Sequence, residues 1–372
     1  MNRHNDIKVI ISGGGTGGHV FPAIAIANAL KRMVPHAAIL FVGALGRMEM
    51  ERVPAAGYEI KGLPVAGFNR REPWKNIGVA AKLIRSIRMA GRIISDFNPS
   101  VVAGVGGYAS GPVMWVARRR GIPFVIQEQN SYAGLTNRLV AKGASSVCVA
   151  WDDMERYFPA QSIVKTGNPV RNLFSGGERL REEALTHFGI DGTSPVVLLL
   201  GGSLGAASLN SVAELKSDGL RESGVTWIWQ SGRRYYDRVR SAVGRAKAKN
   251  VVVKDFIERM DLAYAVADII VSRAGAGTIS ELTLAGKPVV LVPSPNVVAD
   301  HQTRNAEYLQ ERDAALLLPD GMVAEGLISS VVSLVNDEGL RERLAANISR
   351  MAITGSDEMI AKEILKYAGY GG

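Results

Sequence analysis

One local pattern occurs twice in this chain and limits what it can fold into: an apolar strand, a glycine-rich turn and then a helix. The first copy joins residues 7–11 to Gly13-Gly14-Gly15-Thr16-Gly17-Gly18-His19, and the second joins residues 196–200 to Gly201-Gly202-Ser203-Leu204-Gly205-Ala206. Such a turn directs backbone N–H groups outward at a helix N-terminus, where an oxyanion or a diphosphate is stabilised. The repeat predicts two similar halves, each with an anion-binding loop.

The rest of the chain supports two domains built on parallel sheets. Apolar runs rich in Val and Ile alternate with helical patterns, which is typical of strands joined by crossover helices, and 372 residues suffice for two cores. We expect strands at 7–11, 38–43, 60–65, 100–104, 123–127, 146–150, 195–200, 225–230, 250–254, 268–271 and 288–292. The polar stretch 167–178 between them, marked by Pro169, is interpreted as the interdomain linker.

Composition excludes several classes of protein. Hydrophobic residues make up 47% and charged residues 21% of the chain, which is a globular balance. The single cysteine, Cys148, rules out a disulfide or a cysteine-based metal site within one chain. The first apolar run is a strand of five residues rather than the core of a signal peptide, and no run of 18 apolar residues occurs. We therefore expect a cytoplasmic protein that meets any membrane from its surface.

The net charge of +9 is concentrated in one segment and points to an anionic partner. Segment 74–95 predicts an amphipathic helix, with apolar Leu83, Ile84, Ile87 and Ile94 on one side and basic Lys82, Arg85, Arg88 and Arg92 on another. We expect this helix to dock on an anionic membrane surface, assisted by Trp74, Lys75, Ile77 and Trp115. The alternatives are a helix that covers a sheet with its basic face in water, and a nucleic-acid-binding segment; the latter leaves both glycine loops unexplained.

The first glycine loop fits neither common nucleotide motif. Gly13, Gly15 and Gly18 match G-x-G-x-x-G, but a dinucleotide-binding domain needs an acidic residue at the end of the second strand, where residues 39–44 offer none. Glu49 and Glu51 lie too far beyond the end of the second strand to take that place. No Lys-Ser or Lys-Thr pair completes a Walker loop in either half. Nucleotide recognition must be built differently.

His19 is the first candidate for chemistry. It lies in the opening turn of a helix, and a helix N-terminus disfavours the charged imidazolium, so we expect a neutral ring able to accept a proton. The alternative is a histidine that only caps or packs the loop.

The second half offers a candidate for binding a ribose. If a helix begins near Gly277, Glu281 lies one turn inside it, where its carboxylate can accept bonds from two vicinal hydroxyls. The alternative is an ordinary glutamate in the first turn, favoured by the helix dipole. Gln302, at the start of a later helix, can both donate to and accept from sugar hydroxyls.

A series of short motifs in chain order carries a family resemblance. The motifs are Gly13-Gly14-Gly15-Thr16-Gly17-Gly18-His19, Gln127-Glu128-Gln129-Asn130, Gly167-Asn168-Pro169-Val170-Arg171, Gly201-Gly202-Ser203-Leu204-Gly205-Ala206, the stretch 273–281 and Asp300-His301-Gln302. Together they resemble the bacterial peptidoglycan N-acetylglucosaminyltransferases of glycosyltransferase family 28. The resemblance implies the GT-B architecture, an α/β fold in which two Rossmann-like domains, 1–170 and 171–350, flank a deep cleft. A helix within about 351–372 would return to the first domain.

The same resemblance implies an activity and its site. The family moves N-acetylglucosamine, with inversion, from UDP-N-acetylglucosamine to the 4-hydroxyl of muramoyl-pentapeptide on undecaprenyl diphosphate, converting lipid I to lipid II. Donor contacts then fall on Thr16, Gly17, Gly18, Asn130, Arg171, Ser203, Ile257, Ala276, Gly277, Thr278, Glu281 and Gln302. Ile257 would contact uracil through its backbone, and Gly277 departs from the leucine often found there in the family. His19 is the preferred base, with Glu128 as the alternative.

Further expectations concern cofactors, partners and location. The chain lacks an Asp-x-Asp metal motif, so we expect metal-independent chemistry without a cofactor, with N–H groups at the Ser203 loop and Arg171 holding the diphosphate. The partners would be UDP-N-acetylglucosamine, lipid I, an anionic membrane surface and cell-division or elongation proteins, and not nucleic acid. The location would be peripheral, at the cytoplasmic face of the cell membrane. A related GT-B enzyme acting on a soluble acceptor or another glycolipid is the alternative.

Overall fold

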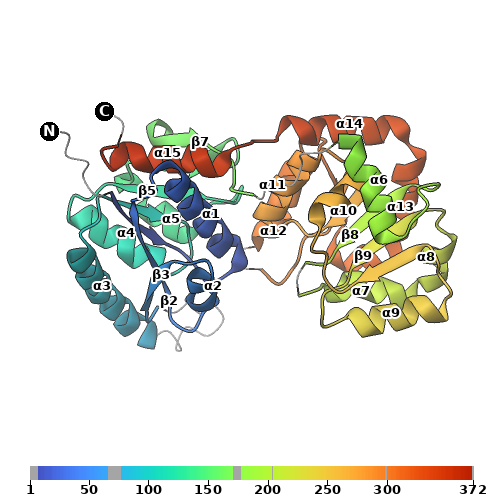
Figure 1. Ribbon diagram of the computed structural model, residues 1–372, viewed down its shortest axis with the longest axis horizontal. Helices are drawn as coiled ribbons and strands as arrows, with labels where there is room; N and C mark the ends of the chain where they lie inside the picture. Colours follow the sequence, from blue (N-terminus) through green and yellow to red (C-terminus); the bar gives the residue numbers. More distant parts are fainter. Residues whose placement is uncertain (1–6, 66–76, 171–176, 203, 298–299, 371–372) are drawn as a thin grey trace. The chain divides into compact units, whose positions relative to one another are not determined.

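The computed structural model describes residues 7–65, 77–170, 177–202, 204–297 and 300–370. Two compact units make up the chain: unit 1 is Met1–Val170 with Ile353–Gly372, and unit 2 is Arg171–Ala352. Each unit has its own parallel sheet covered by helices (Figure 1). The fold is therefore α/β, with two Rossmann-like units, as the sequence predicts.

The sheet of unit 1 has the strand order β3-β2-β1-β4-β5-β6-β7, and all its strand pairs are parallel. Its strands are β1 (Lys8–Ser12), β2 (Ala38–Ala44), β3 (Glu59–Leu63), β4 (Val101–Gly104), β5 (Phe124–Glu128), β6 (Ser146–Val149) and β7 (Ile163–Lys165). The central strands β4, β5 and β6 are buried along their whole length. Continuous burial explains the apolar runs at β4 and at the start of β5, although β5 ends in the buried polar residues Gln127 and Glu128 and β6 begins with buried Ser146.

Helices cover both faces of this sheet. The helices α1 (Gly17–Met33), α2 (Glu49–Ala55) and α15 (Ser356–Tyr367) pack together, and α15 lies along α1 in Figure 1. The helices α3 (Ile77–Phe97), α4 (Ser110–Arg119) and α5 (Leu135–Val140) form a second packed group. Right-handed crossovers place the connections on either side of β1 on opposite faces, so the two groups cover opposite faces of the sheet. The 3-10 turns are η2 (Ala141–Gly143), η3 (Met154–Arg156) and η4 (Ala160–Ser162).

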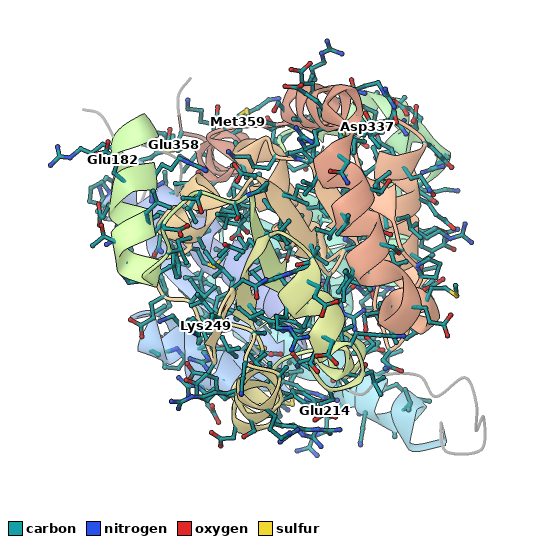
Figure 2. The ribbon with its side chains drawn as sticks, turned by 90° about the vertical axis from the view of Figure 1, so that its right-hand side faces the viewer. Glu182, Glu214, Lys249, Asp337, Glu358 and Met359 are labelled. Carbon is teal, nitrogen blue, oxygen red and sulfur yellow. The ribbon has the colours of Figure 1, made fainter. Side chains whose placement is uncertain are left out.

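Unit 2 repeats this plan with the strand order β10-β9-β8-β11-β12-β13. Its strands are β8 (Val196–Leu200), β9 (Thr226–Gln230), β10 (Val251–Lys254), β11 (Ile269–Ser272), β12 (Val289–Leu291) and β13 (Leu316–Leu317). Its helices are α6 (Gly177–Phe188), α7 (Ala207–Leu215), α8 (Ser217–Glu222), α9 (Tyr236–Arg245), α10 (Met260–Val266), α11 (Ala276–Ala285), α12 (His301–Gln310), η6 (Asp320–Met322), α13 (Val323–Asn336) and α14 (Glu338–Arg350). An ion pair between Glu214, labelled in Figure 2, and Arg238 joins α7 to α9.

The strands predicted from the sequence are confirmed to within two residues at each end. The sequence missed β7 and β13, edge strands of three and two residues that are too short to give an apolar pattern. The predicted linker is wrong at its start, because Gly167 and Asn168 belong to the packed body of unit 1. The Asn168 amide accepts from Gln127 Nε2 at 3.0 Å and donates to the Gln129 carbonyl at 3.0 Å.

The strand orders fix where ligands can bind. In unit 1 the order reverses between β1 and β4, and in unit 2 it reverses between β8 and β11. Ligands of open parallel sheets bind beyond the carboxyl ends of the strands at this reversal. Both glycine-rich turns follow the first strand of such a pair, so each unit has a candidate site at its own switch point.

Candidate functional site

Two glycine loops meet at the switch point of unit 1. The first follows β1, and the second follows β4 at Gly106 and Gly107, whose φ angles of +93° and +86° suit glycine. Gly14 N donates to Gly106 O at 3.2 Å, and a Cβ added to Gly107 would stand 2.2 Å from Gly14 O. The sequence analysis missed the second loop, although Gly104, Gly106 and Gly107 follow an apolar run and signal it.

The buried carboxylate of Glu49 accepts hydrogen bonds from the first glycine loop. Glu49, at the start of α2, is 1% exposed, and its oxygens accept from Gly15 N at 2.9 and 3.1 Å and from Ala44 N at 3.0 Å. The Gly15 amide is therefore already bonded to an internal anion. This corrects the interpretation of the first loop as an open anion site, because part of its donor capacity serves the protein itself.

His19 sits where both loops of unit 1 converge. It is the third residue of α1, whose N-cap is Thr16, and its Nδ1 lies 3.1 Å from Thr16 Oγ1. The other side of the ring lies against the backbone of Gly106, where an added Cβ would be 2.9 Å from His19 Nε2. The ring is half-buried and fixed at both edges, which is what a proton-transfer group requires. Thr16, Gly17 and Gly18 lie beside it at the helix start.

Glu128 is placed differently, at the buried end of β5. Its carboxylate accepts from Asn130 N at 3.1 Å, Gly134 N at 2.9 Å and Asn137 Nδ2 at 2.9 Å. Burial raises the pKa of this carboxyl above its usual value, and the N–H donors oppose that rise. Asn130 is half-buried beside it, and its Nδ2 reaches the same carboxylate at 3.4 Å. The contacts of Glu128 shape the turn 128–137, a role the sequence did not reveal.

In unit 2, Arg273 organises the equivalent switch point. Its guanidinium donates to Asp320 Oδ1 at 2.5 Å, to Ser208 Oγ at 2.9 Å and to the Val292 carbonyl at 3.1 Å. These contacts join the loop after β11 to α7, to η6 and to the end of β12. Arg273 therefore fixes the framework around the second glycine loop rather than presenting its charge outward.

The start of α11 matches the sequence prediction closely. The helix begins at Ala276, with Gly275 as N-cap, so Gly277 and Thr278 also lie in its first turn. No acidic residue lies in that turn, which removes the alternative of Glu281 as an ordinary first-turn glutamate. Glu281 instead accepts from the hydroxyl of Tyr264 on α10, with 3.0 Å between Tyr264 Oη and Glu281 Oε2. A Cβ at Gly277 would meet open space, so nothing in its surroundings requires a glycine.

Two other donor-site candidates lie in unit 2, one on a loop and one at the start of a helix. Ile257 precedes α10, and its backbone N–H donates to Gln230 Oε1 at 2.9 Å. Gln302, in the first turn of α12, accepts from Ser294 N at 2.9 Å through Oε1. The Ile257 N–H and the Gln302 side-chain carbonyl are thus engaged within the protein.

Some predicted site residues fall outside the described residues. These are Arg171, Ser203, Trp74 and Lys75, and for Ile77 only the helical backbone is described.

The buried residues of the basic helix differ from the apolar side that the sequence predicts. The structure has it at Ile77–Phe97, and its buried stripe is Ser86, Ala90 and Ile94, while Leu83 and Ile84 are 47% and 52% exposed. The sequence pattern alone did not show that Leu83 and Ile84 are exposed, although α3 packs on α4.

Exposed apolar side chains also occur on the two neighbouring helices. Trp115 on α4 is exposed, with Arg119 over its ring at 5.1 Å, and Leu135 and Leu139 are exposed on α5. We define the docking face as the exposed apolar and basic residues of these helices: Lys82, Leu83, Ile84, Arg85, Arg88, Arg92, Trp115, Arg118, Arg119, Leu135, Arg138 and Leu139. The sequence analysis did not single out the exposed Leu135 and Leu139 of α5.

Two features are absent from the described ranges of the chain. No three His, Cys, Asp or Glu side chains gather there as a metal site. No helix in the same part of the chain has the length and apolar character needed to cross a membrane.

Two Rossmann-like units, each with a glycine-rich turn at its switch point, form the architecture of the GT-B class of glycosyltransferases. The chain belongs to glycosyltransferase family 28, since residues 9–149 match the N-terminal domain of that family and residues 196–363 match its C-terminal domain.

Known relatives agree with this assignment. A protein of Phocaeicola vulgatus is 51% identical over 364 residues, covering 98% of this chain and 97% of its own. One of Porphyromonas gingivalis is 51% identical over 361 residues, covering 97% and 95%. Both carry the name UDP-N-acetylglucosamine--N-acetylmuramyl-(pentapeptide) pyrophosphoryl-undecaprenol N-acetylglucosamine transferase.

Solved structures show the same fold. The crystal structure of MurG from Acinetobacter baumannii is similar with a TM-score of 0.79 at 28% identity, covering 97% of this chain and 99% of that one. The calicheamicin glycosyltransferase CalG4 shares the fold alone, with a TM-score of 0.72 at 17% identity, over 98% of this chain and 99% of that one.

Proposed function

We propose that this protein transfers N-acetylglucosamine from UDP-N-acetylglucosamine to lipid I, the muramoyl-pentapeptide carried on undecaprenyl diphosphate, and so makes lipid II for peptidoglycan. The observation that carries the proposal is the identity of about half of all residues, over nearly the full length, to relatives named for this reaction. The test is incubation of the pure protein with the donor and a lipid I analogue in EDTA. Formation of disaccharide and UDP is expected; donor hydrolysis alone, or transfer only to a soluble sugar, would contradict the proposal.

Unit 2 holds the donor nucleotide in this proposal. The first turn of α11, at Ala276, Gly277 and Thr278, offers backbone N–H groups and the positive end of a helix dipole to the diphosphate. Glu281 receives the ribose hydroxyls, while Ile257 and Gln302 contact the base and the sugar. Arg171 and Ser203 are proposed to complete the diphosphate contacts. Because N–H groups neutralise the departing UDP, turnover should persist in EDTA.

Unit 1 supplies the base. The acceptor 4-hydroxyl oxygen attacks the anomeric carbon, its proton passes to His19, and the bond from that carbon to the diphosphate breaks with the electron pair leaving on UDP. Inversion follows from this single displacement. The fixed, half-buried ring of His19 supports its choice over Glu128, whose carboxylate is buried and bonded to three residues. Thr16, Gly17, Gly18 and Asn130 are proposed to contact the donor sugar.

The base is tested by His19→Ala, with Glu128→Gln as the competing variant. His19→Ala should retain UDP binding in calorimetry while kcat falls by about 10² to 10⁴, as for loss of a general base. An unchanged kcat would remove His19 from the mechanism. A larger loss in Glu128→Gln, with the melting temperature preserved, would transfer the role to Glu128.

We also propose that the docking face binds the anionic cytoplasmic surface of the cell membrane, where the lipid-linked acceptor resides, with Trp74, Lys75 and Ile77 extending it. Exposed Leu83, Ile84 and Leu139 among cations suit the boundary between headgroups and acyl chains. Each basic residue near such a surface contributes about 1 kcal/mol, and binding weakens with salt. Division or elongation proteins remain proposed partners without a surface assigned to them.

Vesicle sedimentation tests this docking. The protein should sediment with phosphatidylglycerol vesicles at low salt, and the double variant Arg85→Glu/Arg88→Glu should remain in the supernatant. The variant Lys247→Glu/Lys249→Glu changes the net charge equally, at exposed residues of unit 2, and should sediment like the unaltered protein. Equal sedimentation of both variants would show that α3 is not the docking element.

A further inference from the structure

The hydrogen bond between Tyr264 and Glu281 pairs a fully buried side chain with a half-buried one. Tyr264 lies on α10 and is 2% exposed, whereas Glu281 lies on α11 beyond the first turn. Tyr264 Oη stands 3.0 Å from Glu281 Oε2. A buried phenol needs a partner, and here that partner is a carboxylate at the candidate ribose site.

We propose that Tyr264 is a positioning residue that orients the Glu281 carboxylate toward the two hydroxyls of the donor ribose. This inference rests on the proposed role of Glu281 in binding the nucleotide. By orienting Glu281, Tyr264 would allow the site to bind a ribonucleotide more tightly than a nucleotide that lacks these hydroxyls.

The chemistry of the pair supports this assignment. Burial and the neighbouring Glu281 raise the pKa of the Tyr264 hydroxyl well above its usual value, so the phenol stays a hydrogen-bond donor over the whole working pH range. A glutamate side chain on its own samples several rotamers, and one fixed donor selects among them.

Helix α10, which carries Tyr264, is also connected to the loop proposed to contact the nucleotide base. The loop that ends at Arg259 leads directly into α10 and contains Ile257, the candidate contact for the base. The N–H of Ile257 is itself held by Gln230 at 2.9 Å. One short helix therefore connects the loop proposed for the base to the carboxylate proposed for the ribose.

The experiment compares two ligands on three variants by calorimetry: UDP and 2′,3′-dideoxy-UDP on Tyr264→Phe, Glu281→Ala and Tyr308→Phe. Tyr264→Phe keeps the buried ring and removes only the hydroxyl. We expect it to weaken UDP binding by roughly tenfold, as for a lost bond to a charged group, and to change dideoxy-UDP binding by less than about twofold. In turnover, the KM for UDP-N-acetylglucosamine should rise by a similar factor with kcat nearly unchanged. Tyr308, a buried tyrosine on α12, is the matched control.

The outcomes separate this inference from the proposed function. If Glu281→Ala weakens UDP and dideoxy-UDP equally, or neither, Glu281 does not bind the ribose and the proposed role of Glu281 fails. If Glu281→Ala weakens UDP alone while Tyr264→Phe changes neither ligand, or both equally, the role of Glu281 stands and the positioning role of Tyr264 is overturned. A melting temperature of Tyr264→Phe close to that of Tyr308→Phe confirms that the fold is intact.

Discussion

The imidazole of His19 lies against the backbone of Gly106, so that a Cβ added to residue 106 would stand 2.8 Å from His19 Cδ2. The two residues come from different glycine loops, one after β1 and one after β4. Real Cβ atoms do not approach ring atoms so closely, and residue 106 also has φ +93°. Residue 106 must therefore be glycine if the His19 ring is to keep its place beside Thr16.

Gly106→Ala should displace the His19 ring and lower kcat by at least about 10², the lower range for loss of a general base. UDP binding measured by calorimetry should be unchanged, because the residues proposed to hold UDP through its ribose and base lie in unit 2. Gly57→Ala is the matched control: Gly57 has φ +86°, but an added Cβ would meet nothing within 4 Å. Equal losses of kcat in both variants would mean that backbone strain, not the position of His19, is responsible.

The Glu49 carboxylate gives a second prediction for the same loop. In Glu49→Gln an NH2 donor replaces one carboxylate oxygen, either Oε1, which accepts from Gly15 N and Ala44 N, or Oε2, which accepts from Gly15 N. In either orientation of the amide, a donor faces the Gly15 N–H. We expect the free energy of unfolding to fall by about 1–3 kcal/mol and kcat to fall with it, measured by urea unfolding and by turnover. Glu51→Gln changes an exposed glutamate of the same helix and should alter neither quantity. The same unfolding curve for both variants would show that the loop does not depend on Glu49.

Much of the fold was predictable because its signals are local. Strands β4 and β8 are buried on both faces, so their sequences are apolar runs. The turn after β1 and the start of α11 are marked by glycines within a few residues of the strand end. His19 and Glu281 could be placed for the same reason, since each depends only on where its helix begins.

The partners of these residues were not predictable, because they come from distant parts of the chain. Glu49 reaches a loop 34 residues earlier, and Arg273 pairs with Asp320 across 47 residues. No spacing rule links such positions. From the sequence, Glu49 was considered only as a ribose-binding acid and was set aside because it lies too far beyond the end of the second strand. The exposure of Leu83 and Ile84 was missed for another reason. A helical wheel shows that side chains share a face, but not whether a neighbouring helix covers that face.

We expect the main role of Arg273 to be stabilising the fold through internal contacts, rather than presenting its positive charge at the surface. Its ion pair with Asp320 is mostly buried, and it also bonds Ser208 and the Val292 carbonyl. Arg273→Ala removes the cation that pairs with the mostly buried Asp320 and leaves that carboxylate with the Ser208 hydroxyl as a donor, so the free energy of unfolding should fall by about 2–4 kcal/mol in urea titration. Arg343→Ala removes an exposed ion pair with Asp313 and should lower it by less than about 1 kcal/mol. Similar losses in the two variants would contradict the internal role of Arg273.

The buried carboxyl of Glu128 predicts a pH dependence of stability with a definite sign. Its pKa is raised in the folded protein above the usual 4.5, mainly by burial, so between these two values the folded state binds more protons than the unfolded state. The contribution of Glu128 to the free energy of unfolding is therefore fully present below pH 4.5 and decreases as the pH rises through the raised value.

Glu128→Gln does not titrate and supplies the reference for this measurement. The free energy of unfolding of the unaltered protein minus that of Glu128→Gln, from urea unfolding at a series of pH values, should become smaller from about pH 4.5 upward and then level off. A difference that grows with pH would mean that the N–H groups of Asn130, Gly134 and Asn137 stabilise the charged form more than burial destabilises it. In that case Glu128 would be held ionised, and its candidacy as the base would have to be reconsidered.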